Sequence, residues 1–203
     1  MKPSSAFALK SLLHEIKHCS ICAQSIPALN PVVSAPPSAR ILIIGQAPGA
    51  KVHATGIPWD DTSGNRLRRW MDIDERHFYD ESLVAILPMG FCYPGKGKSG
   101  DLPPRPECAP TWHEQVLAYL PNIQCTLLIG QHAQNQYSES AEKTLTQRVQ
   151  TWREYAPKQY LLPHPSPRNQ LWLSRNPWFE SETVPAIQQT IRSISPQTPN
   201  AAG

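Results

Sequence analysis

The stretch that decides the fold is Ile41-Leu42-Ile43-Ile44, followed at once by Gly45-Gln46-Ala47-Pro48-Gly49. Four consecutive aliphatic residues with no polar position between them are typical of a strand that is buried on both faces of a sheet. Glycine after such a strand lets the backbone turn sharply and bring its N–H groups close to a ligand. The stretch therefore predicts a central strand that ends in a binding loop.

Similar apolar runs recur along the chain, at residues 83–87, 126–129 and 160–162. Patterns with helical spacing separate them, around residues 64–71, 111–120, 144–152 and 180–194. An amphipathic helix ending near His18 precedes them all. Strands that alternate with helices predict an α/β fold with three α/β/α layers and a central, mostly parallel four-stranded sheet.

The length of 203 residues suits one domain. We expect a single domain over residues 1–194 and a disordered tail over residues 195–203. The 22 prolines are about twice the ordinary usage, which indicates long, stiff connections. Two long loops, residues 45–62 and 88–110, are of a length that is usually functional in a compact domain.

Composition excludes several protein classes. Hydrophobic residues make up 40% of the chain and charged residues 17%, which is unlike an intrinsically disordered protein. No apolar run approaches the roughly 18 to 20 residues of a membrane span, and the first residues lack the features of a secretory signal. The sequence therefore predicts a cytoplasmic protein with no membrane partner.

Basic residues without acidic neighbours adjoin the candidate loops. One such stretch contains Arg66, Arg68 and Arg69, and another, between Glu154 and Glu180, contains Lys158, Arg168 and Arg175. With a formal net charge of +3, the chain can bind an anionic partner such as nucleic acid. A solvated helix face is the alternative for the three arginines of the first stretch.

A second polar loop, His164-Pro165-Ser166-Pro167-Arg168-Asn169, follows the last predicted strand. Loops that follow parallel strands emerge at the same edge of the sheet, where ligands bind. We therefore expect this loop and the loop at Gly45 to face one cleft.

Together with Thr55-Gly56-Ile57-Pro58-Trp59 and Ser63-Gly64, these two loops resemble the signature loops of the uracil-DNA glycosylase superfamily, in the same order. The resemblance spans roughly residues 15–194. It implies an enzyme that hydrolyses the N-glycosidic bond of uracil or a related deaminated base and leaves an abasic site, as in base excision repair. We expect the enzyme to be monofunctional, because neither signature loop contains a lysine that could form a Schiff base. We expect a monomer whose partner is DNA containing a damaged base.

The resemblance also implies roles for single residues. Gly45, Gln46 and Ala47 would contact the base or the attacking water, Trp59 would stack on the flipped base, and His164 would stabilise the departing base anion. Further residues would contact DNA, with Arg168, Leu171 and Trp172 as candidates for a wedge that enters the duplex. The predicted DNA-binding set is Ser63, Ser166, Arg168, Asn169 and Leu171.

Five cysteines, without a secretory signal, favour thiol or metal chemistry over a disulfide framework. Cys19 and Cys22 close the first helix, and Cys92 and Cys108 flank the second long loop. This arrangement resembles that of the uracil-DNA glycosylases that carry a 4Fe-4S cluster, which implies that these four cysteines bind one. A zinc site is the alternative, and Cys125, in an apolar run, is expected in the core.

Three positions depart from the family pattern. The iron–sulphur enzymes usually have glutamate where this chain has Gln46, other branches have aspartate where it has Ala47, and relatives commonly have asparagine where it has Pro88. Asp60, Asp61 and His53 are the candidates to replace the missing carboxylate. A non-catalytic iron–sulphur protein that binds damaged DNA is the alternative function, and a hydrolase of free nucleosides is a further one.

Overall fold

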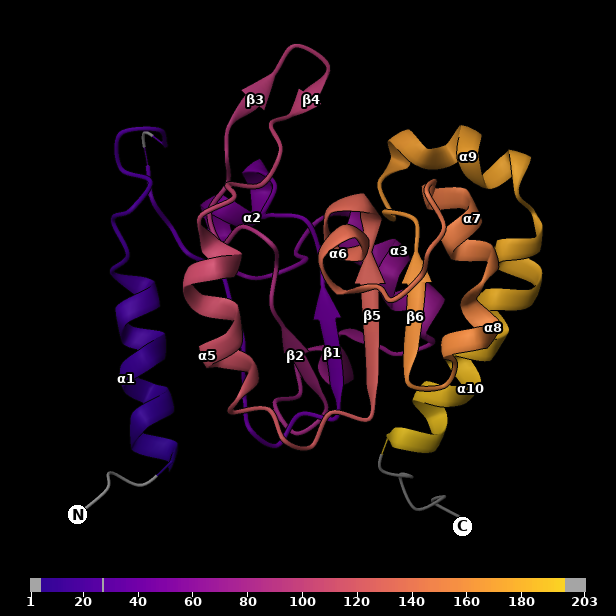
Figure 1. Cartoon of the computed structure of the whole chain (residues 1–203), viewed down its shortest axis with the longest axis horizontal. Helices are drawn as coiled ribbons and strands as arrows, with labels where there is room; N and C mark the ends of the chain where they lie inside the picture. The colour runs from indigo at the N-terminus through magenta and orange to yellow at the C-terminus, as the bar shows by residue number, and fades with distance from the viewer. Residues whose placement is uncertain (1–4, 27, 196–203) are drawn as a thin grey trace.

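The computed structural model describes residues 5–26 and 28–195, and its centre is one parallel sheet (Figure 1). Of the predicted tail, Ser195 is described, and residues 196–203 lie outside the described residues. The four strands run in the order β2-β1-β5-β6, and every neighbouring pair is parallel. Their bounds are β1 (Ile41–Ile44), β2 (Val84–Ile86), β5 (Cys125–Ile129) and β6 (Gln159–Leu162). The predicted α/β/α fold is confirmed, and the predicted strands are all present.

Side chains of β1 alternate between two hydrophobic clusters. Ile41 and Ile43 belong to one cluster, whereas Leu42 and Ile44 belong to the other. All four are at most 4% exposed, as the unbroken apolar run predicts for a strand covered on both faces.

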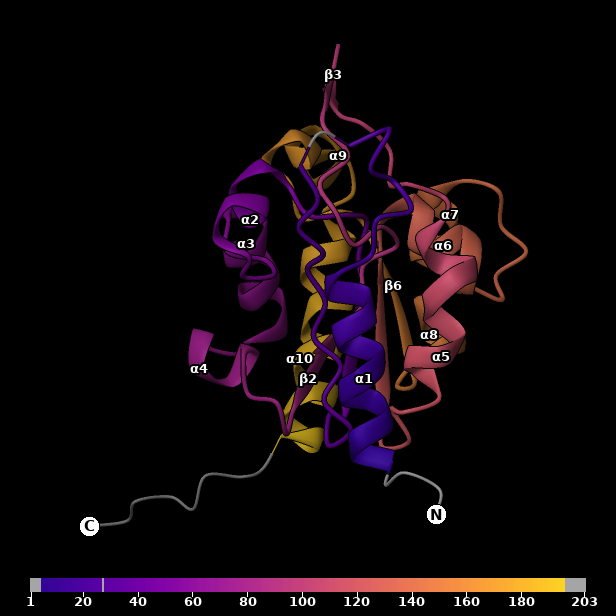
Figure 2. The same cartoon turned by 90° about the vertical axis from the view of Figure 1, so that its left-hand side faces the viewer.

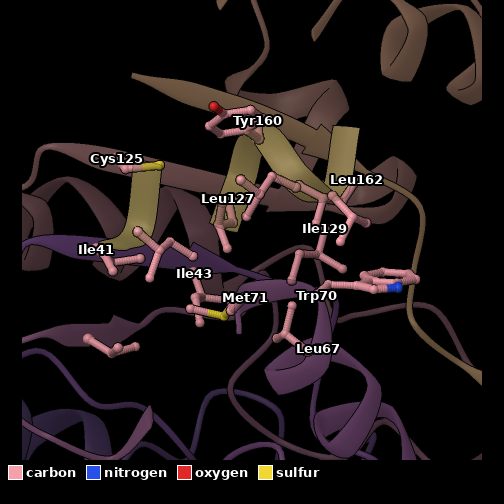
Figure 3. Packing of buried hydrophobic residues seen from close by; sticks show 14 of the residues in the cluster. Ile41, Ile43, Leu67, Trp70, Met71, Cys125, Leu127, Ile129, Tyr160 and Leu162 are labelled. Carbon is pink, nitrogen blue, oxygen red and sulfur yellow. The ribbon is translucent and has the colours of Figure 1, made fainter. Parts of the chain in front are cut away.

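The first face of the sheet is covered mainly by α3 (Thr62–Met71), α4 (Glu75–Phe78) and α10 (Val184–Ile194). Figure 3 shows Leu67, Trp70 and Met71 of α3 pointing toward the side chains of the strands. Cys125 lies in this cluster and is fully buried, as predicted. Burial raises the pKa of its thiol to about 12, so it is inert at neutral pH.

The second face is covered by α1 (Ser5–Lys17), α5 (Glu114–Leu117) and α6 (Gly130–Tyr137). Figure 2 shows the sheet between this layer and the layer of α3. The first helix ends one residue before His18, as its apolar spacing predicts. No helix of the described residues is both long and apolar enough to cross a membrane.

The two long loops contain short elements that the sequence did not predict. The first contains α2 (Ala50–Thr55), which ends at Gly56 in a left-handed conformation with φ of 71°. The second contains a hairpin of β3 (Lys96–Gly97) and β4 (Gly100–Asp101). The remaining helices are α7 (Leu145–Gln150), α8 (Trp152–Tyr155), α9 (Gln170–Arg175), η1 (Ala109–His113), η2 (Pro167–Asn169) and η3 (Phe179–Thr183).

The strand order places a crevice at the carboxyl edge. The connection from β1 leads to α2 and α3 on one side of the sheet, and the connection from β5 leads to α6 on the other. Because β1 and β5 are neighbours, the two loops diverge and leave a gap between them. Such a switch point is where open α/β sheets bind ligands.

Candidate active site

A cavity of about 500 Å³ occupies this switch point. Residues that follow each of the four strands line it, so all four carboxyl ends contribute. The volume is in the range of small-molecule sites. The predicted residues that line it are Gly45, Gln46, Ala47, Trp59, Asp61, Ser63, His164, Ser166, Arg168 and Asn169.

The Trp59 indole forms one wall of the cavity and is held there by two glycines. A β-carbon on Gly45 would lie 2.8 Å from Cζ2 of Trp59, and a β-carbon on Gly64 would lie 1.8 Å from the Trp59 carbonyl oxygen. Only glycine fits at either position without a shift of the tryptophan. Trp59 itself has a φ of 59°, which is uncommon for an aromatic residue. Its ring centroid lies 5.7 Å from that of His164, so a flat ligand that reaches the histidine passes beside the indole.

The His164 imidazole presents a hydrogen-bond donor. Its Nδ1 accepts a hydrogen bond from the Ser166 N–H at 3.2 Å, so in the neutral ring the proton is on Nε2. Burial lowers the pKa of His164, and the nearby carboxylates of Asp61 and Asp101 oppose this only in part. The ring is therefore neutral at neutral pH, with an N–H at Nε2.

Two carboxylates also line the cavity, beside Gly49. A β-carbon on Gly49 would lie 3.8 Å from Oδ2 of Asp61 and 3.9 Å from Oδ2 of Asp101, so both oxygens flank this glycine. Asp61 caps α3 by accepting a hydrogen bond from Gly64 N–H at Oδ1, which leaves Oδ2 available. Asp101 is exposed, and its Oδ1 accepts a hydrogen bond from the Tyr93 hydroxyl.

Asp60 and His53 do not line the cavity, in contrast to our expectation for a substitute base. Asp60 instead forms an ion pair with Lys51 at 3.1 Å. Because Asp61 is fixed as the cap of α3, its chain neighbour Asp60 is turned away from the site.

The loop after β6 is braced from both sides. Asn169 donates a hydrogen bond to the His164 carbonyl at 2.7 Å, and Arg66 of α3 donates to the Ser166 carbonyl at 3.3 Å. Arg68, in contrast, packs over the rings of Phe78 and Tyr79, so it stabilises the fold. Of these two predicted basic residues, Arg66 is thus the one that forms a hydrogen bond with the loop after β6.

The three wedge candidates differ in their surroundings. Trp172 donates a hydrogen bond to the Thr146 hydroxyl at 2.8 Å and packs against the first core cluster, so it is not free to enter a duplex. Arg168 lines the cavity and donates a hydrogen bond to the Ser99 carbonyl. Leu171, which does not line the cavity, is 60% exposed on α9. It is the apolar side chain that is available for this role.

Pro88, at the end of β2, is held by a buried histidine. His113 is 1% exposed, and its Nε2 lies 3.1 Å from the Pro88 carbonyl oxygen, which can only accept. Nε2 therefore donates, and Nδ1 accepts from the Tyr137 hydroxyl. Burial lowers the pKa of His113 to about 4, so the ring is neutral.

The four predicted cysteine ligands lie around one small cavity. Cys19, Cys22, Cys92 and Cys108 line it together with apolar residues and Arg105. The Phe91 N–H donates a hydrogen bond to the Cys108 sulfur at 3.5 Å. The described residues contain no group of three or more His, Cys, Asp or Glu side chains placed to hold a metal ion.

Sequence reasoning missed several residues that line the active-site cavity, among them Gly130, Gln131, His132 and Asp101. Gly130, Gln131 and His132 follow β5. Loops after parallel strands emerge at the same edge of the sheet, and this argument, used for the loops after β1 and β6, would also have found them. Asp101 carries no such signal, because it reaches the cavity through a hairpin within a long loop.

One family model matches this chain: the Uracil DNA glycosylase superfamily, over residues 32–188. The match covers well over half of the chain and contains every residue that lines the active-site cavity. It begins after Cys19 and Cys22, so two of the four cysteines around the small cavity lie outside the match and two, Cys92 and Cys108, lie within it.

The buried His113 predicts a loss of stability in acid. The unfolded chain protonates this histidine below a pH of about 6.5, whereas the folded chain resists protonation until about pH 4. The free energy of unfolding should therefore fall by about 2 kcal/mol between pH 7 and pH 5 through this residue alone. His113→Gln, whose amide can make both hydrogen bonds, should reduce this fall in urea denaturation.

The matched control is His14→Gln, since His14 is exposed on α1. It should keep the acid dependence of the wild type. Equal dependence in His113→Gln and the wild type would contradict the role given to His113.

Proposed function

Since the chain belongs to the uracil-DNA glycosylase superfamily, we propose that it is a DNA glycosylase that hydrolyses the N-glycosidic bond of uracil or a related deaminated base. The observation that carries the proposal is the Nε2 donor of His164 beside the Trp59 ring, in a cavity at the switch point of the sheet. The products are the free base and an abasic site. Reaching the bond in a duplex requires that the nucleotide be flipped into the cavity.

His164 acts on the leaving group. As the bond between C1′ and the base nitrogen breaks, its electron pair moves onto the base, and negative charge develops on a base oxygen. A neutral N–H donor directed at that oxygen stabilises the transition state more than the ground state. The Ser166 N–H keeps the proton on Nε2, and the hydrogen bond from Asn169 fixes the backbone of His164.

Asp61 orients the water. Its Oδ1 is held by the Gly64 N–H, so its Oδ2 is fixed in direction and can accept a hydrogen bond from a water molecule. The water oxygen bonds to C1′ as the base departs, and its proton passes to the carboxylate and then to solvent. The negative charge also stabilises the cationic character of the sugar. Asp61 thus replaces the carboxylate that is missing at Gln46 and Ala47.

The exposed rim binds the duplex. Leu171 occupies the space left by the flipped nucleotide, as apolar wedges do. Ser63, Ser166, Arg168 and Asn169 line the cavity and can contact the DNA backbone near the flipped nucleotide.

Cys19, Cys22, Cys92 and Cys108 bind a 4Fe-4S cluster in the same proposal. Thiolates are the usual ligands of such a cluster, and the proposal is supported by the four thiols that line one small cavity whose other lining residues are apolar apart from Arg105. When bound, the cluster would supply thiolate–iron bonds that tie the segment after α1 to the chain on both sides of the β3–β4 hairpin. No step of base release passes through it.

The function is tested with duplex and single-stranded oligonucleotides that contain uracil, hypoxanthine or xanthine. Incubation with the protein, followed by hot alkali, cleaves the strand wherever a base has been released. Strand cleavage at one of these bases supports the proposal. Tight binding to the same DNA without base release would instead favour the non-catalytic alternative.

His164→Ala should lower the single-turnover rate by about 10²- to 10³-fold, by analogy with the removal of one oxyanion donor. DNA affinity should change little, because the donor acts in the transition state. Rapid-quench cleavage at saturating protein measures the rate, and fluorescence anisotropy measures the affinity. An unchanged rate would remove His164 from the mechanism.

Asp61→Asn should lower the rate by about 10²-fold or more, because the amide keeps the acceptor that caps α3 but loses the charge. Asp60→Asn, next to it in the chain, should have a much smaller effect, since Asp60 pairs with Lys51 outside the cavity. A larger drop in rate for Asp101→Asn than for Asp61→Asn would transfer the role to Asp101.

The cluster is tested by anaerobic purification. The protein should be brown, with broad absorption at roughly 400 nm from thiolate-bound iron. Cys92→Ser should lose this absorption, whereas Cys125→Ala, in the core, should keep it. Colourless protein with one zinc ion per chain would contradict the cluster and support zinc on the same ligands.

A further inference from the structure

The β3–β4 hairpin and its flanks, residues 95–102, form an arm beside the mouth of the active-site cavity. Figures 1 and 2 show the hairpin projecting beyond the carboxyl end of the sheet, at the same end as α9. Asp101 and Leu102, at the base of the arm, line the cavity. A duplex that delivers a nucleotide into the cavity must therefore pass close to the arm.

The arm is attached to the loop after β6. The Arg168 guanidinium donates a hydrogen bond to the Ser99 carbonyl at 3.2 Å. Gly100 has a φ of 150°, and a β-carbon on it would lie 1.9 Å from Nη1 of Arg168, so the guanidinium fits closely against this glycine. At the base of the arm, the Leu102 N–H donates to the Gly95 carbonyl. These contacts fix the arm relative to His164.

The arm carries two exposed lysines and one carboxylate. Lys96 and Lys98 are exposed, and neither forms an ion pair within the described part of the chain. Asp101, opposite Lys96 in the hairpin, instead lines the cavity and accepts a hydrogen bond from Tyr93. Neither lysine is paired with this carboxylate, so both ammonium groups are available to an anionic partner.

We infer that the arm is a second DNA-binding element, separate from the wedge on α9. Lys96 and Lys98 bind phosphates of the duplex, and Leu102, which is 43% exposed, contacts the nucleotide at the mouth of the cavity. DNA fits better than an acidic protein, because the arm forms part of the rim through which the flipped nucleotide enters. This inference rests on the proposed function.

The test is the salt dependence of binding to a uracil-containing duplex, measured by fluorescence anisotropy between about 50 and 200 mM salt. Lys96→Ala/Lys98→Ala should reduce the slope of log K against log salt by about two, because two phosphates of the duplex are no longer neutralised. Lys96→Arg/Lys98→Arg should keep the wild-type slope.

The control double variant is Lys10→Ala/Lys158→Ala, which removes the same charge. Lys10 lies on α1. Lys158, which the sequence grouped with the basic residues near the loops, instead precedes the amino end of β6 and does not line the cavity, whose loops follow the carboxyl ends of the strands. Both lysines are exposed. This control variant should keep the wild-type slope of log K against log salt. An unchanged slope in the arm variant, or an equal reduction in the control, would overturn the inference.

The same measurements separate the arm from the enzyme activity. If the wild type binds DNA but releases no base, and the slope falls only in the arm variant, the inference stands and the proposed hydrolysis fails. If base is released and the arm variant has the wild-type slope, the inference alone fails. A wild type that does not bind DNA would overturn both.

Discussion

Because the sheet is buried on both faces, polar chemistry is confined to its edges. The side chains of β1 are almost fully covered, and its backbone groups pair with β2 on one side and β5 on the other. A polar side chain within these strands would be cut off from water without a partner, at a cost of several kcal/mol. The strand ends are the first positions where such groups can be solvated or can bind a ligand. Parallel strands bring four of these ends to one edge, and the cavity lies there.

Small residues and one strained residue then shape the cavity. Gly45 and Gly64 approach the Trp59 indole and carbonyl more closely than any side chain would allow. Trp59 has a positive φ, a conformation that costs on the order of 1–3 kcal/mol for a residue with a side chain. Its packing against the first core cluster offsets this cost. The strain is therefore located at the wall that faces His164, where the ring position matters most for a flat ligand.

The sequence predicted the sheet and most of the cavity, because both follow from strands and from what comes directly after them. It could not distinguish between neighbours such as Asp60 and Asp61, since the choice depends on which one caps α3. The same limit applies to Leu171 and Trp172, where the turn of α9 exposes one and buries the other in part. Asp101 was missed because a hairpin, rather than a strand end, carries it to the site.

The protonation state of His164 results from opposing effects. Burial disfavours the imidazolium, whereas the carboxylates of Asp61 and Asp101 favour it, and burial is the larger effect. A closer carboxylate would pull a proton onto Nδ1, and the ring would then lose its hydrogen bond from the Ser166 N–H. In the proposed hydrolysis, a more distant one could not stabilise positive charge on the sugar. The position of Asp61, beside Gly49 and tied to the start of α3, meets both requirements of this proposal. It leaves the histidine neutral as a donor and keeps a negative charge within the same cavity.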